Sequence, residues 1–203
     1  MSIRKIIIKI KQRIFFGINY FIFQKTRILK YKILSNCNSV EGKPRYNSPA
    51  LLAGNGKIIF EGEVNLGVIS SPFFYNSYIY IESRNINSTV KIENGVWINN
   101  NASIISDGEG VYIGSDTLIG SNFSVYDSDF HNVSPLKRND GSHKTGAVVI
   151  NKNVFIGTNV SILKGVTIGE NSVIANGSIV VKSIPANVIA GGNPCKIIKN
   201  IDL

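Results

Sequence analysis

Aliphatic residues recur every six positions along much of this sequence, and that period constrains the fold more than any other feature. A unit of six residues is too short for a helix and a loop, but it is long enough for a short strand and a tight bend. A period of this kind predicts a solenoid, because no single unit can bury its aliphatic side chain without stacking on its neighbours. The longest uninterrupted run is Ile150, Ile156, Ile162, Ile168, Ile174 and Val180.

Two shorter runs precede it in shifted frames. They are Ile86, Ile92, Ile98 and Ile104, followed by Ile113, Ile119 and Val125. The first residue of each unit is expected to point inward, and Gly or Asn near the bends tolerates the positive φ that tight bends need. Three units close a triangular coil. We therefore predict an all-β solenoid whose core consists of stacked columns of Ile and Val.

The breaks between the frames predict surface loops. Ile113 follows Ile104 by nine positions, and Ile150 follows Val125 by 25. Extra residues in a solenoid form loops at its surface, commonly on the binding face. The longer break predicts a protruding loop near 128–149. His131 lies at the root of this loop, in the sequence SVYDSDFHNVSP.

The N-terminal segment differs in charge from the rest of the chain. Residues 1–32 hold nine of the 22 basic residues, and the first acidic residue is Glu41. The remaining 13 basic residues match the 13 acidic ones, so the body of the protein does not predict a nucleic-acid-binding surface. We expect one or two amphipathic helices in this arm, broken near Gly17. Its apolar face either packs on the body or on a neighbouring subunit, or docks on an anionic membrane surface, and the two alternatives are compatible.

Composition suggests where the parts begin and end. Residues 42–57 are rich in Gly, Pro, Asn and Ser, which is typical of a connector. We accordingly divide the chain into an arm and connector (1–50), a β-helix domain (51–190) and a C-terminal closing segment (191–203).

Cysteine usage and hydropathy indicate a cytoplasmic protein, in peripheral contact with the inner membrane face if the arm docks there. Cys37 and Cys195 are far apart and lack metal-ligand spacing, which suits a reduced compartment better than a disulfide framework. The apolar residues near the N-terminus are broken by charges, and no signal peptide or membrane-spanning run is expected.

The repeat resembles that of the hexapeptide-repeat acyltransferases, whose fold is a left-handed parallel β-helix. The stretch VFIGTNVSILKGVTIGENSVIANGSIVVKSIPANVIAGGNPCKII is similar to the family's C-terminal run almost unit by unit. The similarity covers about residues 86–198 and is greatest with the galactoside and maltose O-acetyltransferases and with enzymes that acetylate surface polysaccharides. Left-handedness is implied by this resemblance alone, since parallel crossovers are normally right-handed.

The resemblance implies a homotrimer that binds acetyl-coenzyme A between adjacent subunits and uses a histidine as general base. Here the matching residue is His131, in DSDFHNV. An imidazole suits the role because its ordinary pKa lies near neutral. A carboxylate at the other ring nitrogen would fix the tautomer. Asp129 is preferred over Asp127 for this, since residues two apart share a face of an extended segment. His143 is expected to be an ordinary solvated loop residue.

The family's sugar-binding members place an Asn and an Asp, eight residues apart, against the acceptor hydroxyls. The similar segment here is NNNASIISDGEGVYIG, which assigns these roles to Asn99 and Asp107. Both types are also ordinary turn residues. The sequence departs from the family at Asn132, where proline usually follows the histidine, and the arginine-containing loop is represented by PLKRND.

For the co-substrate, the resemblance implies a pantetheine groove lined by Phe155, where the family usually has Trp. Backbone groups of Gly157 and Thr158 would bond the pantetheine amides. Other positions that match the family's coenzyme A site are Asn176, Gly177 and Ser178 toward the adenine and Lys182 and Lys196 toward the phosphates, where a lysine acts as a point charge. Cys195 is expected to be a packed small residue, because no base is paired with it in sequence.

These features predict an acetyl-coenzyme A-dependent O-acetyltransferase acting on a sugar hydroxyl, with a bacterial capsule, a lipopolysaccharide or one of their precursors as acceptor. An N-acyltransferase of an amino sugar nucleotide uses the same scaffold and base, and a non-catalytic trimeric β-helix is the alternative from another class. No metal is expected, since two histidines in the chain are too few for a metal-dependent β-helix enzyme.

Overall fold

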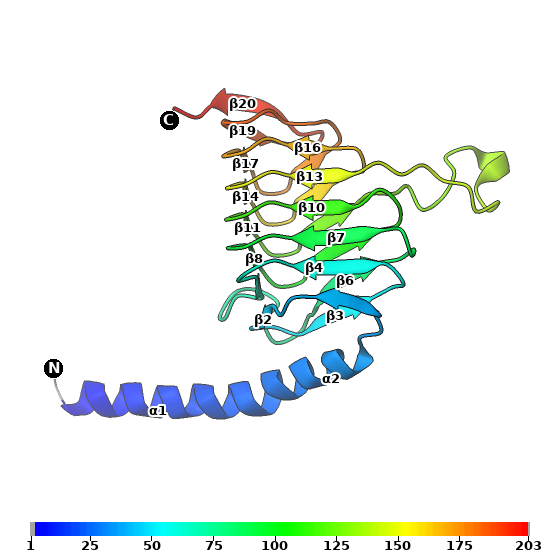
Figure 1. Ribbon diagram of the computed structural model, residues 1–203. Helices are drawn as coiled ribbons and strands as arrows, with labels where there is room; N and C mark the ends of the chain where they lie inside the picture. The colour runs from blue at the N-terminus through cyan, green and yellow to red at the C-terminus, as the bar shows by residue number, and fades with distance from the viewer. Residues whose placement is uncertain (1–2, 203) are drawn as a thin grey trace.

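The computed structural model describes residues 3–202, which form an N-terminal helical arm followed by a stack of short parallel strands (Figure 1). The strands fall into three sheets, of six, eight and six strands. From β5 to β18, successive strands of the chain pass from one sheet to the next in rotation. Each turn of the chain therefore contributes one strand to every sheet.

The sheets are named A, B and C in the order in which the chain enters them. Sheet A contains β1 (Ser39–Glu41), β4 (Lys57–Phe60), β7 (Thr89–Ile92), β10 (Val111–Ile113), β13 (Val148–Ile150) and β16 (Thr167–Ile168). Sheet B contains β2 (Arg45–Tyr46), β5 (Asn65–Leu66), β8 (Trp97–Ile98), β11 (Leu118–Ile119), β14 (Phe155–Ile156), β17 (Val173–Ile174), β19 (Val188–Gly191) and β20 (Lys196–Asn200). Sheet C contains β3 (Ala50–Ala53), β6 (Ile79–Ser83), β9 (Ser103–Ser106), β12 (Ser124–Tyr126), β15 (Ser161–Ile162) and β18 (Ile179–Val180).

The predicted columns of aliphatic side chains are present. Ile150, Ile156 and Ile162 lie on sheets A, B and C, and each pairs with the residue 18 positions later in the next coil. All of them are buried, as are their partners. Three six-residue units therefore make one coil, and the core is a set of Ile and Val columns parallel to the stack.

Ile86 is the exception, and the expectation that it points inward is wrong. It lies between β6 and β7, and 80% of its surface is exposed. The chain makes a wider bend there, after Ser83 and before Thr89. Ile86 thus shares the spacing of the first frame without occupying a column.

Asparagines support the corners between sheets B and C. Asn101, Asn122 and Asn159 follow one another along the stack with φ of 63°, 57° and 58°, values that Asn tolerates better than most residues. The Asn101 side-chain amide donates to the Asn122 side-chain oxygen at 2.8 Å, and Asn122 donates to Asn159 at 2.7 Å. This ladder gives the recurring Asn of the repeat a structural role.

The segment expected to be a connector is instead part of the coil. Residues 42–57 contain β2 and β3 and the first residue of β4, and the first parallel strand begins at Ser39. Gly42 turns the corner after β1 with φ of 82°, where a Cβ would clash with the Phe60 carbonyl. The Gly, Pro, Asn and Ser of this stretch mark corners, so the coil begins before residue 51.

The arm is a continuous helix and is not broken at Gly17. It comprises α1 (Ile3–Asn19), a π-helical segment η1 (Tyr20–Lys25) and α2 (Thr26–Leu34), and Gly17 lies inside α1. The irregularity falls on the π-helical segment, where the arm meets the coil. No helix within residues 3–202 has the length and hydropathy needed to span a membrane.

The opposite end of the stack is closed by the antiparallel pair β19 and β20. Cys195 lies in the turn between them and is 8% exposed. Burial raises the pKa of its thiol. A buried thiol that resists ionisation suits a packing role, as the sequence indicated.

Two isoleucines from the same sequence frame allow a direct test of the columns. We expect Ile98→Ala to lower the free energy of unfolding by about 2–5 kcal/mol, because a fully buried side chain leaves a cavity. Ile86→Ala should change it by less than about 0.5 kcal/mol, because this residue is exposed. Urea unfolding followed by circular dichroism measures both. Equal losses in the two variants would contradict the assignment of the column.

Candidate active site

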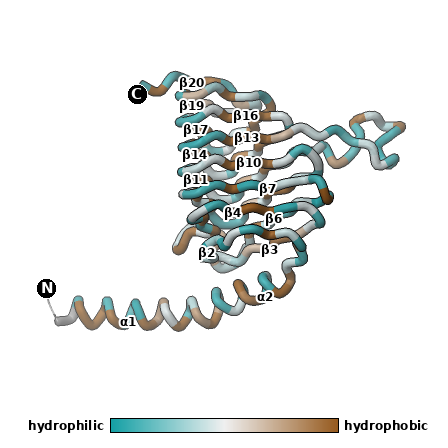
Figure 2. The backbone as a smooth tube through the Cα atoms, viewed as in Figure 1, coloured by the Kyte–Doolittle hydropathy of each residue, from teal (hydrophilic) through white to brown (hydrophobic). Residues whose placement is uncertain are grey.

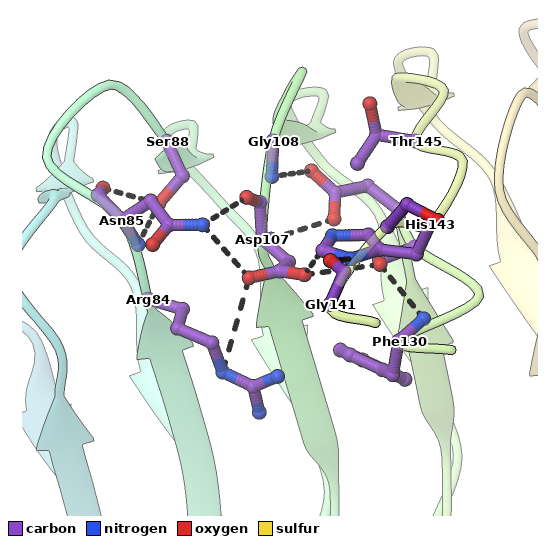
Figure 3. Close-up of polar contacts among 12 residues, drawn as sticks. Arg84, Asn85, Ser88, Asp107, Gly108, Phe130, Gly141, His143 and Thr145 are labelled. Atoms are coloured by element: carbon purple, nitrogen blue, oxygen red, sulfur yellow. Dashed lines mark hydrogen bonds and ion pairs between the residues drawn. The ribbon is translucent and has the colours of Figure 1, made fainter. Parts of the chain in front are cut away.

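Three of the predicted site residues, Asp107, Asp129 and His131, lie where sheet C turns into sheet A. Three consecutive coils widen at this corner, at residues 84–88, 107–110 and 127–147. The last of these is the predicted protruding loop, which extends away from the stack in Figure 1. It carries a 3-10 turn, η2 (Pro135–Lys137). Figure 3 shows the polar side chains at the base of the corner.

A buried carboxylate, that of Asp127, holds the middle coil of this corner. Its side chain is fully buried and accepts hydrogen bonds from the Ser106 hydroxyl at 2.8 Å and from the backbone N–H groups of Asp107 at 2.7 Å and Gly110 at 2.8 Å. The Gly108 N–H donates to it at 3.2 Å. These contacts satisfy the backbone N–H groups of a bend that has no neighbouring strand to accept from them. Asp127 therefore holds the corner in place and is not free to orient a histidine.

Asp107 is the centre of the polar cluster in Figure 3. It is 5% exposed. Its Oδ1 accepts a hydrogen bond from the Asn85 side chain at 2.9 Å and lies 4.0 Å from Arg84 Nε. Its Oδ2 accepts from the Ser128 hydroxyl at 3.1 Å and lies 2.7 Å from His143 Nε2. Both carboxylate oxygens are therefore engaged within the chain.

Arg84 is fixed at the edge of the same cluster. It makes two hydrogen bonds to Glu82, at 3.0 and 3.1 Å, and its guanidinium lies 4.8 Å from the centre of the Phe130 ring. The hydrogen bond with Glu82 raises the pKa of Arg84. The arginine thus supplies a permanent positive charge beside Asp107.

His143 is not the solvated loop residue that the sequence indicated. Its side chain is 24% exposed and its Nε2 contacts Asp107, while its Nδ1 lies 3.2 Å from the Gly141 carbonyl. Both ring nitrogens of His143 therefore have a polar partner within the chain.

His131 has the opposite character. It is exposed, and its Nδ1 lies 3.2 Å from the Arg138 carbonyl. A carbonyl only accepts, so Nδ1 carries the hydrogen, and the lone pair of the neutral ring lies on Nε2. Within residues 3–202 that nitrogen has no hydrogen-bond partner. This contact favours the tautomer whose lone pair lies on Nε2.

The carboxylate expected to orient this ring does not contact it in the part of the chain that the structure describes. Asp129 Oδ2 lies 3.5 Å from Lys164 Nζ, and the Asp129 N–H donates to the Lys144 carbonyl. Asp129 and His131 do line one small hollow of about 30 Å³, together with Lys144. The backbone carbonyl of Arg138 takes the orienting position that the sequence assigned to Asp129.

The two predicted acceptor residues lie at opposite ends of β9. Asn99 follows β8 at the corner between sheets B and C, where its side-chain amide donates to the Ser71 hydroxyl at 2.9 Å. Asp107 follows β9 at the corner between sheets C and A. One chain therefore presents these side chains at two different corners.

Phe155 lies on sheet B in a row of exposed apolar side chains. It pairs in register with Leu118, which pairs with Trp97. The three are 52%, 49% and 39% exposed. Trp97 and Leu118 were not singled out in the sequence, although their spacing from Phe155 follows the repeat and is the pattern that would have found them.

The corner after β14 offers fewer free backbone N–H groups than the sequence suggested. The N–H of Gly157 donates to the Ile174 carbonyl at 2.8 Å, and that of Thr158 donates to the Asn176 side chain at 2.9 Å. Both N–H groups are thus occupied, and Asn176 acts as a support for the corner. A Cβ at Gly157 would clash with Asn176, so the glycine is needed for close packing.

The remaining coenzyme-site candidates divide into buried and exposed residues. Ser178 is buried and donates to the Ala175 carbonyl at 2.6 Å, which makes it part of the coil. Gly177 has open space around its Cα and a φ of 72°. Lys182 and Lys196 are exposed, and neither makes an ion pair within the described residues. Over the same residues, His, Cys, Asp and Glu form no cluster of three suited to a metal ion.

Comparison with known proteins identifies the family. The bacterial transferase hexapeptide family, in its form with six repeats, matches residues 147–182. A candidate acetyltransferase of Saccharomyces cerevisiae is 38% identical over 156 residues, covering 76% of this chain and 74% of that protein. The chain belongs to the hexapeptide-repeat acetyltransferases.

Other relatives agree with this assignment. The galactoside O-acetyltransferase of Escherichia coli is 41% identical over 115 residues, which cover 57% of this chain and 56% of that enzyme. The enzyme of the same name from Lactococcus lactis is 39% identical over 53% of this chain and 51% of its own length. The chain thus matches about half the length of each of these two enzymes.

Similarity to a solved structure covers most of the fold. The acetyltransferase NeuO, described as specific for polysialic acid, superposes with a TM-score of 0.57 at 28% identity, covering 82% of this chain and 85% of that one. A second polysialic acid O-acetyltransferase superposes with a TM-score of 0.59 at 22% identity, which shows the fold alone.

The role of Asp127 is directly testable. Asp127→Ala leaves several buried donors without an acceptor, so we expect the free energy of unfolding to fall by about 2–4 kcal/mol. Asp129→Ala, on an exposed residue of the same segment, should cost less than about 1 kcal/mol. Thermal unfolding of the two variants measures the difference. An Asp127→Ala variant as stable as Asp129→Ala would show that the corner does not depend on this carboxylate.

Proposed function

We propose that the protein is an acetyl-coenzyme A-dependent O-acetyltransferase that acts on a sugar hydroxyl, with His131 as its general base. The observation that carries the proposal is the hydrogen bond between His131 Nδ1 and the Arg138 carbonyl. It leaves Nε2 without a hydrogen-bond partner among the described residues, in the protruding loop. The other histidine has no such free nitrogen, because Asp107 and Gly141 occupy both of its ring positions.

The reaction requires one proton to move twice. His131 Nε2 takes the proton of the acceptor hydroxyl as that oxygen forms a bond to the thioester carbonyl carbon. Collapse of the tetrahedral intermediate breaks the carbon–sulfur bond. The imidazolium then returns the proton to the departing sulfur, which leaves an acetyl ester and free coenzyme A. The Arg138 carbonyl stabilises the Nδ1–H throughout, so the ring need not turn between the two steps.

The residues present suit coenzyme A as the acyl donor. The exposed row of Phe155, Leu118 and Trp97 offers an apolar strip for the pantetheine arm. Lys182 and Lys196 are exposed cations that suit the phosphates. The occupied N–H groups at Gly157 and Thr158 mean that carbonyl groups and side chains, more than backbone donors, would bind the amides.

We infer that the complete site forms between copies of the chain in a homotrimer of left-handed coils, as the family resemblance implies. His131 lies at the corner between sheets C and A, whereas Phe155 lies on sheet B. This corner and this sheet face would meet if a second copy placed one against the other. The outer side of sheet C carries the small residues Ser103, Ser124 and Ser161, which allow coils to approach closely.

A surface polysaccharide or its precursor is the acceptor class that the comparisons favour. The similar structure of NeuO belongs to an enzyme described as specific for polysialic acid. Asn99 and Asp107 are the proposed hydroxyl ligands. Because both oxygens of Asp107 are engaged, an acceptor hydroxyl would have to displace His143 from Oδ2. We place the reaction in the cytoplasm, where acetyl-coenzyme A is made.

Replacing each histidine in turn tests the mechanism. We expect His131→Ala to lower kcat by about 10²–10⁴-fold, which is the usual contribution of a general base. His143→Ala should lower it much less and chiefly change KM for the acceptor, since its ring competes with the acceptor for Asp107. Coenzyme A release from acetyl-coenzyme A, measured against a panel of sugars and oligosaccharides, gives both constants.

Comparing the two histidine variants distinguishes the possible mechanisms. Acceptor-dependent turnover that survives in His131→Ala would overturn the role of this residue. A larger loss in His143→Ala would transfer the base to that histidine. If the wild-type protein binds no coenzyme A, the assignment as an acetyltransferase of this kind is wrong.

A mixing experiment tests whether sites form between copies. His131→Ala removes the base, and Phe155→Asp places a charge in the apolar strip without disturbing a buried residue. Co-expression of the two inactive variants should restore activity to about a quarter of the wild-type value, because random trimers then contain some interfaces with both wild-type parts. Sites contained within single chains would regain nothing.

A further inference from the structure

Helix α1 leaves the coil with its apolar side chains uncovered. Ile6, Ile10, Ile14 and Ile18 recur at every fourth position and form one row along the helix. Each is between 40% and 57% exposed, and the neighbouring Phe15 is 72% exposed. Figure 2 shows hydrophobic and hydrophilic residues alternating along this helix, which extends beyond the coil. The row is long enough and exposed enough to need a partner.

A row of basic residues lies beside it. Lys5, Lys9 and Arg13 precede Ile6, Ile10 and Ile14 by one position each, so the two rows run side by side along the helix. The first acidic residue of the chain is Glu41, which lies beyond the end of α2. The helix therefore carries only positive charge.

The arm is attached firmly where it meets the coil. Gln24 is fully buried, and its amide donates to the Phe74 carbonyl at 3.0 Å. Arg27 donates to the Gln24 side chain at 2.8 Å and to the same carbonyl at 3.1 Å. Ile28 of α2 is buried, and Tyr31 stacks on Tyr78 with 4.4 Å between ring centres. These contacts fix the direction in which α1 leaves, across the end of the stack (Figure 1).

The length and charge of α1 suit the surface of a bilayer and not its interior. Seventeen residues span about 25 Å at the rise of an α-helix, and no helix of residues 3–202 has the hydropathy of a membrane span. A helix with an apolar row beside a basic row binds at the level of the lipid headgroups. Its cations then lie against lipid phosphates while its apolar side chains reach the acyl chains.

A second copy of the arm fits this surface less well. Two arms that packed through their isoleucine rows would bring two sets of basic residues together without a single acidic partner, and like charges at short range oppose association. The rest of the chain has equal numbers of acidic and basic residues and offers no matching excess of negative charge. An anionic lipid surface supplies both the apolar and the negatively charged partner.

We propose that α1 binds the surface of an anionic membrane, with its isoleucine row among the acyl chains and Lys5, Lys9 and Arg13 at the lipid phosphates. The inference goes beyond the proposed reaction and does not depend on it, since it rests on the arm alone.

Sedimentation of the full-length protein with lipid vesicles tests the proposal. We expect binding to vesicles of phosphatidylcholine mixed with phosphatidylglycerol and little binding to phosphatidylcholine alone. The double variant Ile10→Glu with Ile14→Glu should bind at least about tenfold more weakly, because two apolar contacts are lost and charge is added. Ile86→Glu places one such charge on an exposed isoleucine outside the arm and should bind like the wild type. Added salt should weaken binding by screening the lysines.

Any of the following results would overturn the proposal. Absence of wild-type binding to the anionic vesicles excludes a membrane partner. Equal binding to both kinds of vesicle excludes the role of the basic row, and undiminished binding of the double variant excludes that of the isoleucine row. If wild type does not bind vesicles and the double variant lowers the oligomeric mass measured by light scattering, the arm packs against a second copy. Circular dichroism of the variants confirms that the coil is intact.

Discussion

The coil is held in register by the burial of one aliphatic side chain in every six residues. Each such residue is covered by its equivalents in the coils above and below, as Ile156 is by Ile119 and Ile174. A strand that slipped by one residue would expose its aliphatic side chain to water and bury a polar one. Extra residues can therefore enter only at the corners. The corner between sheets C and A takes them in three successive coils, and there the chain places its polar cluster.

The widened corner is stable because a side chain replaces the hydrogen bonds that a strand would have made. Asp127 accepts from three backbone N–H groups and from the Ser106 hydroxyl. It thereby fixes the backbone at Asp107, whose carboxylate collects Asn85, Ser128 and His143 around itself. The two aspartates play different roles. Asp127 supports the backbone, whereas Asp107 binds side chains that a substrate could displace.

The regular part of the fold could be predicted from the sequence because its period is local. The columns follow directly from the spacing of Ile150, Ile156 and Ile162, and the loop follows from the break after Val125. Corners and connectors share the same residue types, so residues 42–57 were assigned wrongly. Gly17 was given too much weight: one glycine costs a helix interior only about 1 kcal/mol, which does not end the helix.

The site was harder to predict because its contacts join distant parts of the chain. His143 lies 36 positions after Asp107, and nothing in the loop sequence indicates that it returns to that carboxylate. The group that orients His131 is a backbone carbonyl seven positions later, which has no residue signature at all. Family resemblance located His131 by its motif. It could not show that one ring nitrogen lacks a partner on this histidine, while both have one on the other.

The arm and the site together suggest how the acceptor reaches the enzyme. In sheet C, β12 leads to His131 and is separated from β3, at the arm's end of the stack, by two intervening strands. Three strand spacings put β12, from which the loop with the histidine leaves, roughly 14 Å along the stack from β3. Under the two proposals made above, with the arm on a membrane surface and a sugar as acceptor, this height suits a glycan attached to a lipid through a short chain of sugars. A free monosaccharide would gain nothing from the arm. The two proposals taken together therefore favour a lipid-linked precursor over a soluble sugar.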